Sequence, residues 1–149
     1  MNDQRILLYR GTTPDWPGSK GLQAIRVTPT TSDPLVATLF GLECLRFGPA
    51  IVQMCNQAAV SSLLEPANVL ADLEKEVAVG LPPDEFTRRF AESFLPVLVA
   101  RDILAELGFE LPPTVANKVA LQGLLKSTPR LRSEDIAVFE ARAREWRLP

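Results

Sequence analysis

Two glutamates, Glu74 and Glu76, stand one residue apart in the segment EKEVAV. The alternation of polar and apolar residues there predicts a half-buried strand, which puts both carboxylates on one face with their Cα atoms roughly 6–7 Å apart. Two carboxylates this close, when partly buried, take different roles, and one of them can have a raised pKa. The alternative is a solvated run of charges at a strand end, the commoner fate of such a sequence.

A second chemical group is Arg10, which ends the run ILLYR and is followed by Gly11. The guanidinium of an arginine at a strand end can bind a phosphate or a carboxylate through two parallel hydrogen bonds, and a glycine beside it lets a ligand approach the backbone. The alternative is an ordinary surface arginine at the end of a strand.

The third group is a cluster of hydroxyls, Thr30, Thr31 and Ser32, just before Asp33 and Pro34. Hydroxyls and free N–H groups at a helix start can hold a polar ligand or a neighbouring carboxylate. The alternative is simple capping of the helix, which needs only Ser32 or Asp33. Capping alone would leave Thr30 and Thr31 without an assigned role.

The composition limits the chemistry, because the chain has no histidine. Catalysis by Ser-His-Asp or Cys-His and the commonest zinc ligand are therefore excluded, and we expect no metal site. Sixteen basic and eighteen acidic side chains give a net charge of −2, which argues against nucleic acid as the partner. Apolar runs are too short for a signal peptide or a membrane span, and Cys44 and Cys55 lack metal-site spacing. We expect a cytoplasmic protein with reduced thiols.

Alternating or aliphatic runs bounded by turn residues indicate the strands that would position these groups. We expect strands over residues 5–10, 24–27, 50–55 and 74–79, and a loop with at most one short helix over residues 56–73. Apolar residues at helical spacing, with capping residues and prolines, predict the helices. We expect them from Pro34 to just before Gly48, from residue 82 to Pro96, and over residues 97–107, 115–125 and 133–146, with Ser133 as a cap.

These elements predict an α+β fold in one domain, residues 1–149, with a strand-rich part over residues 1–80 and a helical part over residues 81–149. The spacing of Phe86, Phe90 and Phe94 places them on one helix face, which we expect to pack against the sheet.

The three groups together resemble the ADP-ribosyltransferase fold of the arginine–serine–glutamate type. That family has an arginine ending its first strand, a Ser-Thr-Ser-like strand that runs into a helix, and a Glu-x-Glu opening a later strand. LYRG, PTTSDPLVATLF and EKEVAV stand for these three here, with Thr30 in place of the first serine. The family continues with further strands after the glutamates, whereas the residues after Gly80 have helical patterns here, so we expect a shortened sheet.

The resemblance implies an enzyme that takes NAD⁺ as its substrate, breaks the nicotinamide glycosidic bond and transfers ADP-ribose. Arg10, with Gly11 beside it, would contact the diphosphate, and Thr30, Thr31 and Ser32 would hold the nicotinamide ribose region. Glu76 would stabilise the oxocarbenium ion, and Glu74 would engage the acceptor, a protein or a small molecule, with arginine the usual acceptor group in the family. Such a protein would be a toxin, an effector or a modifier.

A different class of function stays open, in which an inactive transferase-like fold serves as a protein interaction module. The partner would bind the helical part, where Lys118, Lys126, Arg130 and Arg132 could form a basic patch. The alternative for these four residues is a set of solvated helix faces.

Overall fold

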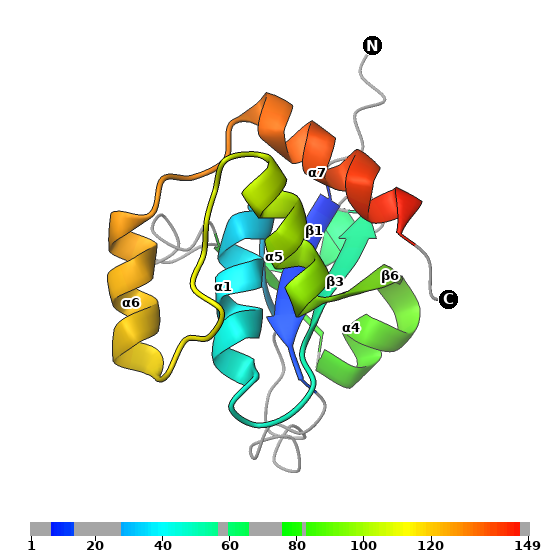
Figure 1. The fold of residues 1–149 in the computed structure, drawn as a ribbon. Coiled ribbons are helices and arrows are strands. Elements are labelled where there is room, and N and C mark those ends of the chain that lie inside the picture. The colour runs from blue at the N-terminus through cyan, green and yellow to red at the C-terminus, as the bar shows by residue number, and fades with distance from the viewer. Residues whose placement is uncertain (1–6, 14–27, 57–59, 66–75, 82, 147–149) are drawn as a thin grey trace.

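A computed structural model of the 149-residue chain describes residues 7–13, 28–56, 60–65, 76–81 and 83–146. One antiparallel sheet of six strands, in the order β4-β5-β2-β1-β3-β6, runs through the molecule (Figure 1). The strands are β1 (Leu7–Thr12), β2 (Thr28–Thr31), β3 (Ile51–Asn56), β4 (Leu64–Glu65), β5 (Glu76–Val79) and β6 (Ala91–Pro96).

Helices cover both faces of this sheet, and most of them come from the second half of the chain. They are α1 (Pro34–Cys44), the 3₁₀ turn η2 (Ser61–Leu63), α4 (Pro83–Phe90), α5 (Val97–Glu106), α6 (Lys118–Ser127) and α7 (Ser133–Glu145). The predicted α+β class is therefore confirmed. None of the helices in the described ranges is long and apolar enough to cross a membrane.

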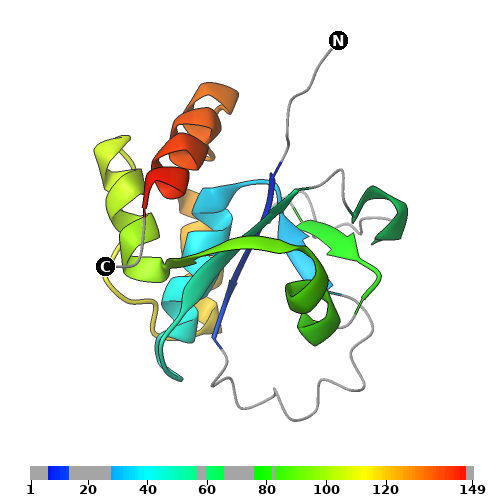
Figure 2. The same cartoon turned by 90° about the vertical axis from the view of Figure 1, so that its right-hand side faces the viewer.

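The two faces of the sheet are covered unequally. Helices α1, α5, α6 and α7 lie on one side, and α4 lies on the other (Figure 2). On the first side, residues from both halves of the chain share one buried cluster, among them Tyr9, Leu39, Leu121 and Phe139. On the second side, a smaller cluster joins Phe86 of α4 to sheet residues such as Leu8. We refer to these as the α1 side and the α4 side.

Helix α1 begins where the sequence predicts, because its local signals are unambiguous. The carboxylate of Asp33 accepts a hydrogen bond from the backbone N–H of Leu35 at 2.8 Å, and Pro34 takes the first helical position. The helix ends at Cys44, earlier than the expected stop at Gly48. The strands expected over residues 50–55 and 74–79 are found as β3 and β5, whereas the strand expected over 24–27 lies outside the described residues.

The prediction of one helix from residue 82 to Pro96 is wrong in its second half. The helix α4 ends at Phe90, and β6 follows at once and pairs with β3 at the edge of the sheet. Leu95 is buried at 1% exposure, while its neighbour Phe94 is 47% exposed, which is the alternation of a strand and not a helix face. Pro96 explains the extended backbone before it, because proline disfavours helical geometry at the preceding residue.

Two expectations fall with that correction. Phe94 does not share a buried face with Phe86, and the sheet does not stop after the glutamates, because β6 extends it beside β3. Among the later helices, α6 begins at Lys118, after Asn117, whose side chain accepts from the N–H of Ala120 at 2.8 Å. The predicted start at residue 115 is therefore wrong.

Candidate functional site

The three predicted motifs lie on three neighbouring strands, β5, β2 and β1. In the sheet register, Thr31 pairs with Glu76 on one side and with Tyr9 on the other. The backbone positions of Tyr9, Thr31 and Glu76 therefore form one row across the sheet, and Arg10 stands in the next row. The fold thus brings together motifs that are 20 or more residues apart in the sequence.

The rows of a sheet alternate between its two faces, and the motif positions divide accordingly. The row of Tyr9 belongs to the α1 side, where Tyr9 is buried in the larger core cluster. The next row, that of Arg10, belongs to the α4 side. Register therefore puts Arg10 and position 76 in rows of opposite faces. The structure does not describe Glu74 or the side chain of Glu76, so the expected pair of carboxylates lies outside what it shows.

Arg10 is part of a polar chain on the α4 side. Its guanidinium donates to the side-chain oxygen of Gln53 at 3.4 Å, and the amide nitrogen of Gln53 donates to the hydroxyl of Thr87 at 3.1 Å. Gln53 is only 5% exposed, and burying an amide is costly unless it is hydrogen-bonded. These hydrogen bonds therefore orient the guanidinium of Arg10 between β1 and α4. Sequence reasoning missed Gln53 and Thr87, because cross-strand and strand–helix neighbours leave no local pattern.

Gly11 lies on the α1 side, directly under helix α1. A Cβ atom at this position would contact the backbone oxygen of Ala37 and would stand 2.5 Å from the backbone nitrogen of Gly41. The close approach of α1 to β1 thus accounts for a glycine here without a ligand.

One hydroxyl of the predicted cluster is used by the turn between β2 and α1. The hydroxyl of Thr31 accepts a hydrogen bond from the backbone N–H of Asp33 at 3.2 Å, so this side chain has a structural role that the sequence did not reveal. Thr30 and Thr31 are both buried, at 4% and 5% exposure, and Ser32 is partly exposed. Thr30 and Thr31 are the last residues of β2 and Ser32 follows it, whereas the strand expected from the sequence covered residues 24–27 only.

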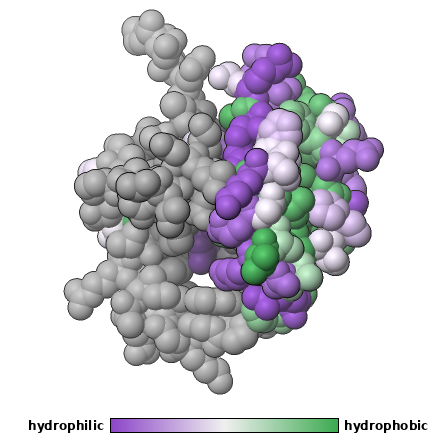
Figure 3. Space-filling model, turned by 90° about the vertical axis from the view of Figure 1, so that its left-hand side faces the viewer, coloured by the Kyte–Doolittle hydropathy of each residue, from purple (hydrophilic) through white to green (hydrophobic). Residues whose placement is uncertain are grey.

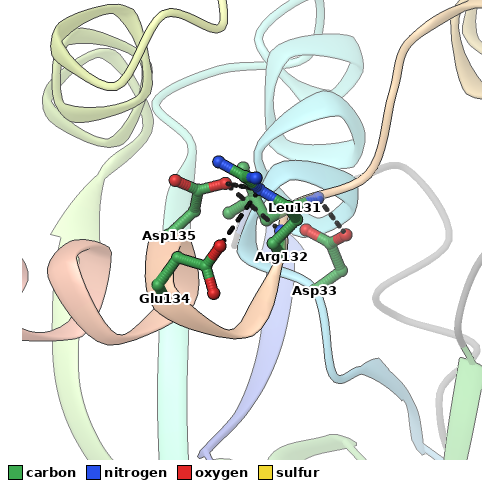
Figure 4. A network of polar contacts seen from close by, with 5 residues as sticks. All are labelled: Asp33, Leu131, Arg132, Glu134 and Asp135. Carbon is green, nitrogen blue, oxygen red and sulfur yellow. Dashed lines mark hydrogen bonds and ion pairs between the residues drawn. The ribbon is translucent and has the colours of Figure 1, made fainter.

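Asp33 has a second partner that is far away in the sequence. Its other carboxylate oxygen accepts from the backbone N–H of Leu131 at 3.2 Å, across 98 residues (Figure 4). Asp33 is 3% exposed, and burial raises the pKa of its carboxyl above the ordinary value, while the N–H groups of Leu35 and Leu131 act in the opposite direction. Sequence analysis identified Asp33 as a cap and missed this contact.

The basic residues expected to form a patch on the helical part have different surroundings. Arg130 donates to the carbonyl oxygens of Leu125 and Thr128 at the end of α6, and Arg132 forms an ion pair with Glu134 at 3.2 Å. Only Lys118 and Lys126 remain as exposed charges on α6 itself. Figure 3 shows the side of the molecule on which α6 lies, where hydrophilic and apolar areas are mixed.

No family model matches this chain, and no curated protein and no solved structure was found that matches it. Within the described ranges, no group of three or more His, Cys, Asp or Glu side chains is placed to hold a metal ion.

Proposed function

We propose that the chain is a mono-ADP-ribosyltransferase that uses NAD⁺ as its substrate. The observation that carries the proposal is the adjacency of the three motif strands, because it places the backbones of Arg10, Thr31 and Glu76 in two neighbouring rows of one sheet. We place the activity in the cytoplasm, in keeping with the two free thiols of Cys44 and Cys55.

In the proposed reaction, the bond between C1′ of the ribose and the nicotinamide nitrogen breaks, and nicotinamide leaves with the bonding electrons. Positive charge then develops on the ribose, and the carboxylate of Glu76 stabilises it. Arg10 binds the diphosphate, and the hydroxyls of Thr30, Thr31 and Ser32 hold the nicotinamide ribose region. Glu74 orients the acceptor, which attacks C1′ and loses a proton. The acceptor is a guanidinium of a protein or a small molecule.

The direct test measures nicotinamide release from NAD⁺ by chromatography. We expect turnover by the wild type and a loss of roughly 10²-fold or more in Glu76→Gln, because that substitution removes the charge that stabilises the transition state. Glu110→Gln is the matched control, since Glu110 is exposed and lies far along the chain from the three motifs. A folded wild type that releases no nicotinamide would refute the proposal.

One observation favours a second function, a non-catalytic interaction module. The rows of Arg10 and Glu76 belong to opposite faces, and Thr31 and Asp33 already serve the turn before α1. In this case the partner binds the helical part, where Lys118 and Lys126 are exposed. Calorimetric titration with NAD⁺ separates the two functions, because the module would neither bind NAD⁺ nor release nicotinamide.

A further inference from the structure

One buried carboxylate joins the hydroxyl-bearing turn to the C-terminal part of the chain. Asp33 uses one oxygen for the N–H of Leu35 and the other for the N–H of Leu131, and its own backbone N–H donates to Thr31. A helix cap needs only the first of these bonds. The second oxygen has a different role: it attaches the connection between α6 and α7 to the turn between β2 and α1 (Figure 4).

A second contact attaches the same C-terminal segment to the neighbouring strand. The ring of Phe139 in α7 packs edge-on against the ring of Tyr9, with centroids 5.9 Å apart. Tyr9 is the cross-strand partner of Thr31, so both contacts reach the row that contains Thr31. Leu131 and Phe139 are buried, and the start of α7 between them is fixed by the N–H of Arg132, which donates to Asp135 at 3.3 Å.

We propose that Asp33 is a positioning residue, which ties the C-terminal segment of residues 131–139 to the turn at Thr31 and Ser32 and so sets the geometry of the NAD⁺ site. The inference rests on the proposed function. Asp33 does not touch the reacting atoms. It acts through the turn, and the C-terminal helix α7 becomes part of the site's support although it carries none of the motif residues.

The test uses the full chain with Asp33→Asn. The amide oxygen can still cap α1, but the amide nitrogen cannot accept from the N–H of Leu131, so this substitution removes the long-range bond selectively. Because the turn is assigned to NAD⁺ binding, we expect KM for NAD⁺ to rise roughly tenfold with kcat changed by less than about twofold. We also expect faster amide hydrogen exchange at both Leu131 and the turn.

Asn117→Ala is the matched control, because it removes a cap whose hydrogen bond is local to α6 and does not reach the turn. It should lower the melting temperature through loss of a cap, as in other helices, without changing KM. Phe139→Leu weakens the second attachment and keeps a residue of similar size, so it should raise KM less than Asp33→Asn does. This variant also tests the idea if Asp33→Asn does not fold.

The outcomes separate this inference from the proposed function. If the wild type turns over NAD⁺ and Asp33→Asn shows an unchanged KM, or the same KM change as Asn117→Ala, then Asp33 is only a cap and the inference is wrong. If the wild type releases no nicotinamide, the proposed function has failed, and a role of Asp33 in NAD⁺ binding fails with it. Hydrogen exchange then still decides the tether, because unchanged exchange at the turn in Asp33→Asn would show that the two segments are not coupled.

Discussion

Substitution of Gly11 by alanine should destabilise the protein severely, because helix α1 crosses β1 at this residue. The added Cβ would contact the backbone oxygen of Ala37 and would lie 2.5 Å from the nitrogen and 3.0 Å from the Cα of Gly41. These are backbone atoms, which cannot rotate away, so α1 would have to move off the sheet. The buried face of α1, with Leu35 and Leu39 at 0% exposure, would lose contacts with it.

The expected cost follows from that geometry. Overpacking of a core typically costs 1–3 kcal/mol, and the shift of a whole helix puts Gly11→Ala at about 3 kcal/mol or above. Since domains of this size are stable by about 5–15 kcal/mol, the variant should remain folded in the cold with a melting temperature lower by roughly 6–12 °C.

Two other glycines calibrate the prediction. A Cβ at Gly41 would stand 2.7 Å from Cγ2 and 3.4 Å from Cβ of the buried Val97, which would have to shift, but alanine gains helix propensity there, so Gly41→Ala should cost less than Gly11→Ala. A Cβ at Gly123 meets nothing within 4 Å inside α6, so Gly123→Ala should stabilise the protein by about 1 kcal/mol.

Urea unfolding followed by circular dichroism measures all three free energies of unfolding, with the slopes checked for equality. The reasoning is refuted if Gly11→Ala is as stable as the wild type, or if it is more stable than Gly41→Ala. A stable Gly11→Ala variant that has lost NAD⁺ binding would instead support the interpretation from the sequence, in which this glycine makes room for a ligand.

Tyr9 and Asp33 are buried and Cys44 is half-buried, and each carries a titratable group. Tyr9→Phe should leave stability unchanged or raise it by about 1 kcal/mol, because the buried hydroxyl has no hydrogen-bond partner among the residues that the structure describes; a loss above about 1 kcal/mol in urea unfolding would show that it has one. Burial, followed by the charge of Glu43, raises the pKa of Cys44 to about 11 from 9.0, so in a Cys55→Ala background its alkylation at pH 8 should be roughly 100-fold slower than that of a free cysteine peptide; an equal rate would contradict the burial of this thiol. Since burial raises the pKa of Asp33 above 3.8, the folded state binds this proton more tightly than the unfolded state, and the stabilisation present below pH 3.8 is lost as the pH rises through the raised value. The stability of the wild type relative to Asp33→Asn should therefore fall as the pH rises above 3.8, and a constant difference would contradict the shift.

The sequence predicted those parts of the fold whose causes are local. The adjacent residues Asp33 and Pro34 define the start of α1, and the aliphatic run of β3 lies between turn residues. It failed at β6, where Phe86, Phe90 and Phe94 have a helical period but only the first two are in a helix. Pairing with β3, about 40 residues away, decides the structure of that segment, and a local window does not contain this information.

The candidate site shows the same division. The spacing of the motifs was enough to expect Arg10 and Glu76 on strands of one sheet, and they are, but the register puts their rows on opposite faces of it. It was not enough to show which residues the fold itself requires. Neither the contact of α1 with Gly11 nor the bond from Leu131 to Asp33 has a local signature, because each joins residues that are far apart in the sequence.

These structural roles change the value of each motif residue as a test of function. Substitution of Gly11, Thr31 or Asp33 perturbs packing or the turn before α1, so a loss of activity there would not by itself show that the residue contacts NAD⁺. Arg10 and Glu76 test the function more directly, and the side chain of Arg10 bonds to that of Gln53 on β3, away from the turn before α1. Since Arg10 and Glu76 belong to rows of opposite faces, one bound NAD⁺ can depend on both only if it extends past the ends of their strands. If Arg10→Lys loses NAD⁺ affinity and Glu76→Gln loses turnover, with both melting temperatures unchanged, the two residues would therefore belong to one extended site. If neither variant loses NAD⁺ affinity or turnover, the sheet is only a scaffold for the helices.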